Sequence, residues 1–260
     1  MHAGTLLHNR IAPTAGTASV VSALYLDERD RDMPRVAIPR AEIHLVVRIG
    51  PSAIRGLDVH VLGARQRVQR KLIRSGLRSV MARLHLGVPE AVLGAPASAL
   101  AGRIVPLEDL WGDGPARRLS ERLADARTPV DAAAILESAI AERLVTARAR
   151  DAHAELVLDA ADRLSRANVN AVATDLGVSE RHLRRVFHEV IGVSPNAFAK
   201  VTRFGRALRA AREDARASWA SIAAAAGYYD QAHLIAEFRA IAGVTPRALL
   251  GELRADPSLG

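Results

Sequence analysis

The pattern of apolar and polar positions differs between the first 150 residues and the remainder of the chain. In the first part, apolar residues tend to alternate with polar ones, which is the period of a strand with one buried face. The alternation predicts strands at Val20–Leu26, Glu42–Ile49, Leu57–Leu62, Gln66–Ile73 and Leu77–Leu86. A hairpin turn is predicted at Ser75-Gly76, between the last two strands. Helices are predicted at Pro89–Leu100, Ala116–Ala126 and Val130–Arg150.

These elements describe a small β-rich half-barrel followed by helices. Apolar inner positions would leave a concave pocket, which is the usual place for a small ligand. The alternative is a filled barrel that serves only in dimerisation. Trp111 lies in an apolar stretch and is expected to anchor the helices onto the sheet rather than to stack on a ligand.

The last third of the chain contains an internal repeat. His182-Leu183, Phe187 and Gly192-Val193-Ser194-Pro195 recur 51 positions later as His233-Leu234, Phe238 and Gly243-Val244-Thr245-Pro246. A turn that begins with a glycine precedes each copy. The repeated unit is a helix, a tight turn and a second helix, which is the plan of a helix-turn-helix DNA reader. Two such units are predicted, at about residues 171–191 and 219–242.

Local rules build the first unit. Gly177 ends the first helix, and Ser179 is a good N-cap for the second because its hydroxyl can accept from an unpaired backbone N–H. The apolar positions of the second helix have the spacing of one buried stripe: Leu183, Val186, Phe187 and Val190. Its basic positions form a separate face: Arg181, Arg184, Arg185 and His188. An apolar back with an arginine-rich front is suited to reading the major groove.

A long helix over Asn196–Arg212 is predicted to join the two units rigidly. Its basic residues recur every three positions and suggest a basic flank: Lys200, Arg203, Arg206, Arg209 and Arg212. Such a run is usually a solvated face. Residues 176–212, however, hold eight Lys or Arg and two acids, a net charge of +6 that fits contact with DNA phosphates.

The stretch from about His153 to Glu252 resembles the DNA-binding domain of the AraC/XylS transcription regulators. The likeness is carried by LGVSERHLRRVFHEVIGVSP in the first unit and AAAGYYDQAHLIAEFRAIAGVTP in the second. The resemblance implies two helix-turn-helix units that enter adjacent major grooves on one side of the DNA. More weakly, LHLGVPEAVLGAPASALAGRIVPLEDLWG resembles the N-terminal domain of a poorly characterised AraC subgroup, which implies no particular ligand.

The second reading face departs from the family pattern, in which an arginine is common where Ala236 stands. Residues 213–260 hold four Arg and six acids. The equivalents of the first reading face are Ala232, Ile235, Ala236 and Arg239, with Gln231 beside them. Gln231 can pair with adenine, the small apolar side chains can contact thymine methyls, and Arg239 can contact a phosphate. For His182 and His233, which precede buried leucines, a local structural role is the alternative to base contact.

Composition narrows the alternatives. The chain has no cysteine, which excludes disulfides, thiolate zinc sites and cysteine-based enzymes fused to this type of DNA domain. No glycine-rich phosphate loop, HExxH, GxSxG or paired-carboxylate motif occurs, so no enzyme, catalytic residue or cofactor is predicted. His44, His60 and His85 lie on predicted strands without a carboxylate at helpful spacing, so no metal site is predicted. Residues 65–83 carry seven basic residues and no acid, which favours a solvated edge hairpin over an anion or DNA contact.

The predicted fold is α+β, with a β-rich half-barrel and helices as a sensor or dimerisation domain at residues 1–150. An all-α DNA-binding domain of two helix-turn-helix units joined by a long helix follows at residues 153–252. The predicted DNA-binding residues are Ser179, Arg181, His182, Arg184, Arg185, His188, Gln231, Ala232, His233, Ile235, Ala236 and Arg239. No effector-binding residue can be named.

The predicted function is that of a sequence-specific transcription regulator controlled by a small-molecule effector. A weakly specific architectural nucleoid protein is the alternative. Double-stranded DNA is the expected partner, and a second copy of the chain and, for an activator, RNA polymerase are further candidates. Neither a long apolar stretch nor a signal pattern occurs, so a cytoplasmic, nucleoid-associated protein without membrane contact is expected.

Overall fold

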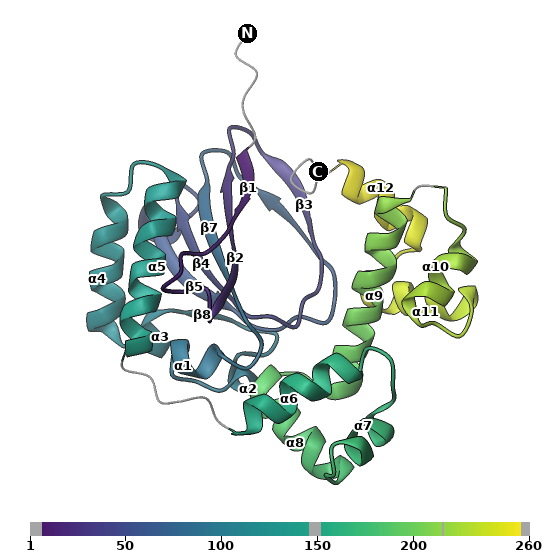
Figure 1. Ribbon diagram of the computed structural model, residues 1–260. Coiled ribbons are helices and arrows are strands. Elements are labelled where there is room, and N and C mark those ends of the chain that lie inside the picture. Colours follow the sequence, from purple (N-terminus) through teal and green to yellow (C-terminus); the bar gives the residue numbers. More distant parts are fainter. Residues whose placement is uncertain (1–6, 146–151, 215, 256–260) are drawn as a thin grey trace.

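The computed structural model describes residues 7–145, 152–214 and 216–255 (Figure 1). A six-stranded antiparallel sheet dominates the N-terminal part, with the strand order β1-β2-β7-β4-β5-β8. Its strands are β1 (Leu7–Ile11), β2 (Val21–Glu28), β7 (Arg78–Leu84), β4 (His44–Ile49), β5 (Leu57–Leu62) and β8 (Ile104–Pro106). Two further strands, β3 (Met33–Ala37) and β6 (Gln69–Ile73), pair only with each other and form what we call the β3–β6 ribbon.

The five predicted strands are present as β2, β4, β5, β6 and β7. The sequence pattern misses β1, β3 and β8. Strand β8 has only three residues, and β3 contains Pro34, which cannot donate to a strand ladder.

The predicted hairpin between β6 and β7 is wrong. β6 pairs with β3, whereas β7 lies between β2 and β4 in the large sheet. The turn itself exists, but Asp32 ties it to the segment before β3, because its carboxylate accepts from the Ser75 N–H (2.8 Å) and from Arg74 (2.7 Å). Since β6 is almost wholly exposed and β7 alternates buried residues, the two strands belong to differently buried surfaces.

The two faces of the large sheet differ in polarity. The face covered by the helices α4 (Asp113–Ala124) and α5 (Pro129–Val145) carries an unbroken set of apolar residues: Leu24, Leu26, Leu45, Val47, Val59, Val61, Val80 and Ala82. The opposite face, which we call the inner face because it is turned toward the β3–β6 ribbon, carries Asp27, His44, Arg48, Asp58 and His60. The inner face also carries the buried apolar residues Val46 and Leu62, so the predicted apolar inner positions are mixed with charged and polar side chains.

The remaining N-terminal helices are α1 (Pro89–Leu93), α2 (Ala97–Leu100) and α3 (Glu108–Trp111). The predicted single helix over Pro89–Leu100 is wrong, since Pro96 separates two short helices. Trp111 is buried in the sheet–helix core, and its Nε1 donates to the Val92 carbonyl (3.0 Å), so it anchors helices to the sheet as expected. Of the predicted helix at Val130–Arg150, the last five residues lie outside the described ranges.

The C-terminal part is all helical. Its elements are α6 (Ala152–Arg163), α7 (Val169–Asp175), α8 (Glu180–Ile191), α9 (Pro195–Glu213), α10 (Trp219–Ala226), α11 (Gln231–Ala242) and α12 (Pro246–Ala255). The predicted long helix over Asn196–Arg212 is confirmed as the unbroken α9. No helix within the described ranges is long and apolar enough to cross a membrane.

Helix α9 takes part in two separate cores. Near its start, Phe198 packs edge-on against Phe187 of α8, with ring centroids 5.4 Å apart. Six residues later, Phe204 is fully buried against Phe238 of α11, with ring centroids 4.5 Å apart. Because one continuous helix lies in both cores, the two helix pairs are held in a fixed relation. The predicted α+β fold, a half-barrel with helices and an all-α part with two such pairs, is confirmed.

Candidate nucleic-acid interface

Each short helix of the repeated units is capped in the same way. The side chains of Asn168 and Ser179 accept from backbone N–H groups at the starts of α7 and α8. Ser218 and Asp230 do the same for α10 and α11. Such caps satisfy donors that a helix start otherwise leaves unpaired. The α7–α8 and α10–α11 pairs are therefore two copies of one locally encoded structure.

The first reading face lies on α8, whose apolar side packs Leu183, Val186, Phe187 and Ile191 into the core. Arg181, Arg185 and His188 are exposed on the other side, and His182 and Arg184 are half-buried. Within the helix, Arg184 Nε donates to Glu180 (2.7 Å) and Arg185 pairs with Glu189 (3.1 Å). Both pairs are largely exposed, so they hold the guanidinium groups only weakly.

The second reading face, on α11, presents almost no charge. Gln231, Ala232, His233, Ala236 and Arg239 are exposed and Ile235 is half-buried. The His233 ring packs against Tyr228 (5.3 Å between centroids), and its Nδ1 accepts from the Tyr229 N–H (3.4 Å). The His182 ring likewise lies 5.9 Å from that of His153. These contacts favour a local structural role for both histidines.

A buried ion pair that sequence reasoning missed joins α9 to α11. Arg203 donates to Glu237 (2.8 Å), and the Glu237 side chain is only 6% exposed. Glu237 occupies the repeat position of Val186, which is buried in the first unit. The sequence contains a signal for this ion pair. Glu237 places a carboxylate at a position of the buried stripe, and a buried charge needs a partner.

The predicted basic flank along α9 is wrong as a single surface. Arg203 is held by Glu237, and Arg206 donates to the Ser165 carbonyl (2.7 Å). Lys200, Arg209 and Arg212 are exposed. The physical reason is the helical period of 3.6 residues, which turns positions three apart steadily around the axis. Two residues of the predicted flank, Arg203 and Arg206, thus form contacts within the protein.

A family model described as a helix-turn-helix domain, of the AraC type, matches residues 172–252. The match begins within α7 and ends within α12. The match places a helix-turn-helix domain of the AraC type in the C-terminal part of the chain. Residues 172–252 thus carry a helix-turn-helix DNA-binding domain. No curated protein matches the sequence.

Several solved structures are similar to the chain. One is the DNA-binding domain of AdpA, a global transcriptional factor, in complex with a target DNA (27% identity, 42% of this chain and 99% of that chain, TM-score 0.36). Another is ToxT from Vibrio cholerae (12% identity, 88% and 96%, TM-score 0.43). A third is ToxT bound to (E)-4-(8-methylnaphthalen-1-yl)but-3-enoic acid (11% identity, 88% and 97%, TM-score 0.46).

The N-terminal domain contacts the AraC-type domain at the C-terminal ends of both reading helices. At α8, the capping residue Gly192 is buried against the Ala97 carbonyl of α2. At α11, the Val68 N–H donates to the Ile241 carbonyl (2.9 Å). The guanidinium of Arg70, on β6, donates to the Ala242 carbonyl (3.0 Å) and to both oxygens of Glu252. These donors satisfy carbonyls that a helix end leaves unpaired.

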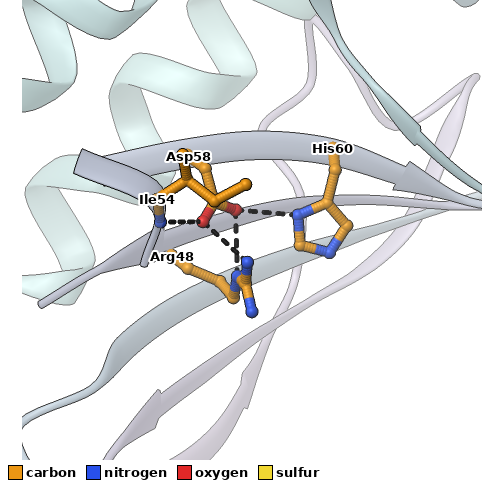
Figure 2. A network of polar contacts seen from close by, with 4 residues as sticks. All are labelled: Arg48, Ile54, Asp58 and His60. Carbon is orange, nitrogen blue, oxygen red and sulfur yellow. Dashed lines mark hydrogen bonds and ion pairs between the residues drawn. The ribbon is translucent and has the colours of Figure 1, made fainter. Parts of the chain in front are cut away.

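The inner face of the sheet holds a polar network around Asp58 (Figure 2). Its carboxylate accepts from Arg48 (2.7 and 2.9 Å) and the Ile54 N–H (2.8 Å), and contacts His60 Nδ1 (2.9 Å). Burial opposes the charged form, but these hydrogen bonds lower the pKa of Asp58 overall. Burial, followed by the nearby arginines, lowers the pKa of His44 to about 3, so that this ring is neutral at pH 7.

The N-terminal domain was also considered for a metal site and for an effector pocket. Among the described residues, no group of three potential ligands, His44, His60 and His85 included, could hold a metal ion. Two hollows are lined by described residues, one between β4, β7 and α5, and one of about 360 Å³ where α9, α10 and α12 meet. Neither of these two hollows lies on the inner face.

Proposed function

We propose that the protein is a sequence-specific transcription regulator that places α8 and α11 in adjacent major grooves of one DNA duplex. The observation that carries the proposal is the unbroken α9, which lies in the cores of two identically capped helix pairs. Two reading helices joined in this way should lie about 34 Å apart, one turn of DNA. Residues 153–252 then form the DNA-binding domain, and residues 1–150 the sensing or dimerising domain.

On α8, the exposed or half-exposed basic residues would provide the direct base contacts: Arg181, Arg184, Arg185 and His188. Arginine paired with guanine is the commonest specific contact in the major groove. Ser179, at the N-terminus of α8, would lie beside a phosphate. His182 would support this face, since its ring lies edge-on to that of His153 and 3.5 Å from the Arg185 guanidinium.

On α11, Gln231 is the candidate for a two-bond contact with adenine, and Arg239 for a phosphate contact. Ala232, Ile235 and Ala236 offer only apolar contacts, which suit thymine methyl groups. His233 would hold the turn through its contact with the Tyr229 N–H. The two half-sites are therefore proposed to differ, the first specified by hydrogen bonds and the second read loosely or through DNA shape.

Control by the N-terminal domain is supported by its contacts with both reading helices. Gly192 at the end of α8 and the Ile241 and Ala242 carbonyls at the end of α11 all meet N-terminal residues. A small-molecule effector that shifts the half-barrel would then change the contacts at the ends of α8 and α11, and with them the access of the rigidly joined helices to DNA. This role implies two further partners, a second copy of the chain and, for an activator, RNA polymerase. It also implies a place in the cytoplasm, at the nucleoid.

A competition assay tests the function against the architectural alternative. The preferred duplex, selected from random DNA, is bound by the full chain at physiological salt and displaced by an unrelated duplex of equal length. We expect a ratio of affinities of at least about 10³, as is typical of sequence-specific regulators. A ratio near one would show a weakly specific architectural protein, for which phosphate contacts supply the whole of the binding.

A further inference from the structure

The fold brings like charges together beside the inner face. Arg35 of β3 and Lys71 of β6 are direct cross-strand partners in the β3–β6 ribbon. Close by along the chain, the Arg65 N–H donates to the Arg40 carbonyl (2.8 Å), which places these two residues side by side. Like charges directly opposite each other destabilise a pair of strands. The arrangement therefore carries a cost unless negative charge lies nearby.

The carboxylates of this region are already engaged. Asp27 pairs with both Arg29 and Arg35 (2.6 Å each). Asp58 is held by Arg48 and His60, and Glu42 lies 4.0 Å from Arg83. In the described part of the chain, no carboxylate forms an ion pair with Arg40, Arg65 or Lys71; Arg65 donates to the neutral amide of Gln69 (3.0 Å).

Strand alternation fixes the side on which Lys71 lies. Its neighbour Arg70 faces the AraC-type domain, where it binds Glu252 (2.7 Å). Lys71 therefore lies on the opposite side of β6 with its partner Arg35, whose guanidinium reaches Asp27 of β2. Arg40 and Lys71 keep contact with solvent and Arg65 is half-buried, so a dissolved ion can reach all three.

The electrostatic field at this place is positive. Burial, followed by Arg35, Arg65 and Arg48, lowers the pKa of Lys71 to about 8, and the Asp27 carboxylate offsets only part of this. Burial and the neighbouring Arg35 and Arg40 also lower the pKa of Arg65. The positive neighbours of each group thus disfavour its charged form. A bound anion would favour the charged form instead.

We propose that Arg40, Arg65 and Lys71 bind a small organic anion with at least two negative charges, carried by carboxylate or phosphate groups. Guanidinium groups pair with either group through two parallel hydrogen bonds, and the lysine adds a point charge. The inference rests on the proposed role of the N-terminal domain and names the chemical class of its effector. Because β6 carries Lys71 on one side and Arg70 on the other, the anion would act on the strand that caps α11.

The two lysines of the chain, Lys71 and Lys200, provide a direct test. Reductive methylation with ¹³C-formaldehyde keeps both charged and gives each an NMR signal, which the Lys200→Gln variant assigns. Citrate serves as the carboxylate probe and inorganic pyrophosphate as the phosphate probe, at constant ionic strength. We expect the Lys71 signal to shift saturably with one probe or both and the Lys200 signal to stay in place. Equal or unsaturable shifts of both signals would overturn the proposal.

Calorimetry on the unmodified protein gives the second readout. Arg65→Gln and Lys71→Gln should each weaken binding of the effective probe by about tenfold or more, the usual loss of a charge-assisted hydrogen bond. The matched control is Arg67→Gln, an exposed arginine of the same segment, which should bind the probe as the parent does. Unchanged affinity in both test variants would contradict the proposal.

The same variants separate this inference from the proposed function. If citrate and pyrophosphate fail to bind while the protein still discriminates its preferred duplex, only the anion site is wrong. If DNA discrimination is absent, the proposed function is wrong whatever the anions do. If Lys71→Gln weakens duplex binding and leaves probe binding unchanged, the cluster is a DNA contact and the anion site is overturned.

Discussion

Alanine at position 184 or 185 should weaken binding to the preferred duplex by about 1–3 kcal/mol and relax base preference in one half-site only. Arg184 and Arg185 lie on α8 in exposed pairs with Glu180 and Glu189. Because exposed ion pairs contribute little free energy, each guanidinium can leave its glutamate and turn to a guanine at a small cost in free energy. Titrations of Arg184→Ala and Arg185→Ala against every single-base variant of the duplex measure the effect.

Two further variants serve as controls for the arginines of α8. Arg239→Ala, at the end of α11, should weaken all sequences alike and reduce the salt dependence, as expected for a phosphate contact. Ala236→Arg should strengthen binding, because it places a cation on an exposed position of the second reading face. Unchanged base preference in both Arg184→Ala and Arg185→Ala would show that α8 does not read the bases.

Substitution of Gly192 should destabilise the protein more than the same substitution at its repeat partner, Gly243. Both residues end a reading helix with a positive φ, +87° and +74°. Alanine costs about 1 kcal/mol in this conformation at either position. Only at Gly192 would the new Cβ lie 2.6 Å from a backbone atom of the N-terminal domain, the Ala97 carbonyl oxygen, whereas nothing lies within 4 Å at Gly243.

The expected loss in the free energy of unfolding is therefore about 1 kcal/mol for Gly243→Ala, and about 1–3 kcal/mol more for Gly192→Ala, the usual cost of overpacking. Urea denaturation of the two variants and the parent measures the difference. Equal losses would mean that the contact between α2 and α8 is absent in solution. In that case, the N-terminal domain could not hold the first reading helix.

The repeated units could be predicted from the sequence because local signals determine them. Ser179 and Asp230 cap helices through contacts with the residue three positions later, and their repeat spacing survives any change in distant packing. The long helix α9 follows in the same way from its apolar positions and its start at Ser194-Pro195.

The elements that sequence reasoning missed depend on distant partners. Strand β6 pairs with β3, and Asp32 holds the turn after β6 through contacts between residues more than forty positions apart. Strand alternation places two classes of side chain on opposite faces but does not say which face the helices cover. The contacts of Arg70 with α11 and α12 cross from one domain to the other. No local pattern encodes such contacts.

Two rigidly joined helices that read DNA unequally should leave two unequal blocks of base preference, which selection of bound duplexes from random DNA by the full chain would reveal. We expect two blocks of base preference with centres one helical turn apart, about 10–10.5 base pairs. One block should be strict and contain guanine, as Arg184 and Arg185 require, and the other looser and rich in A·T pairs, as Ala232 and Ala236 imply. Equal information in the two blocks, or a single block, would show that α8 and α11 do not read DNA in this unequal way.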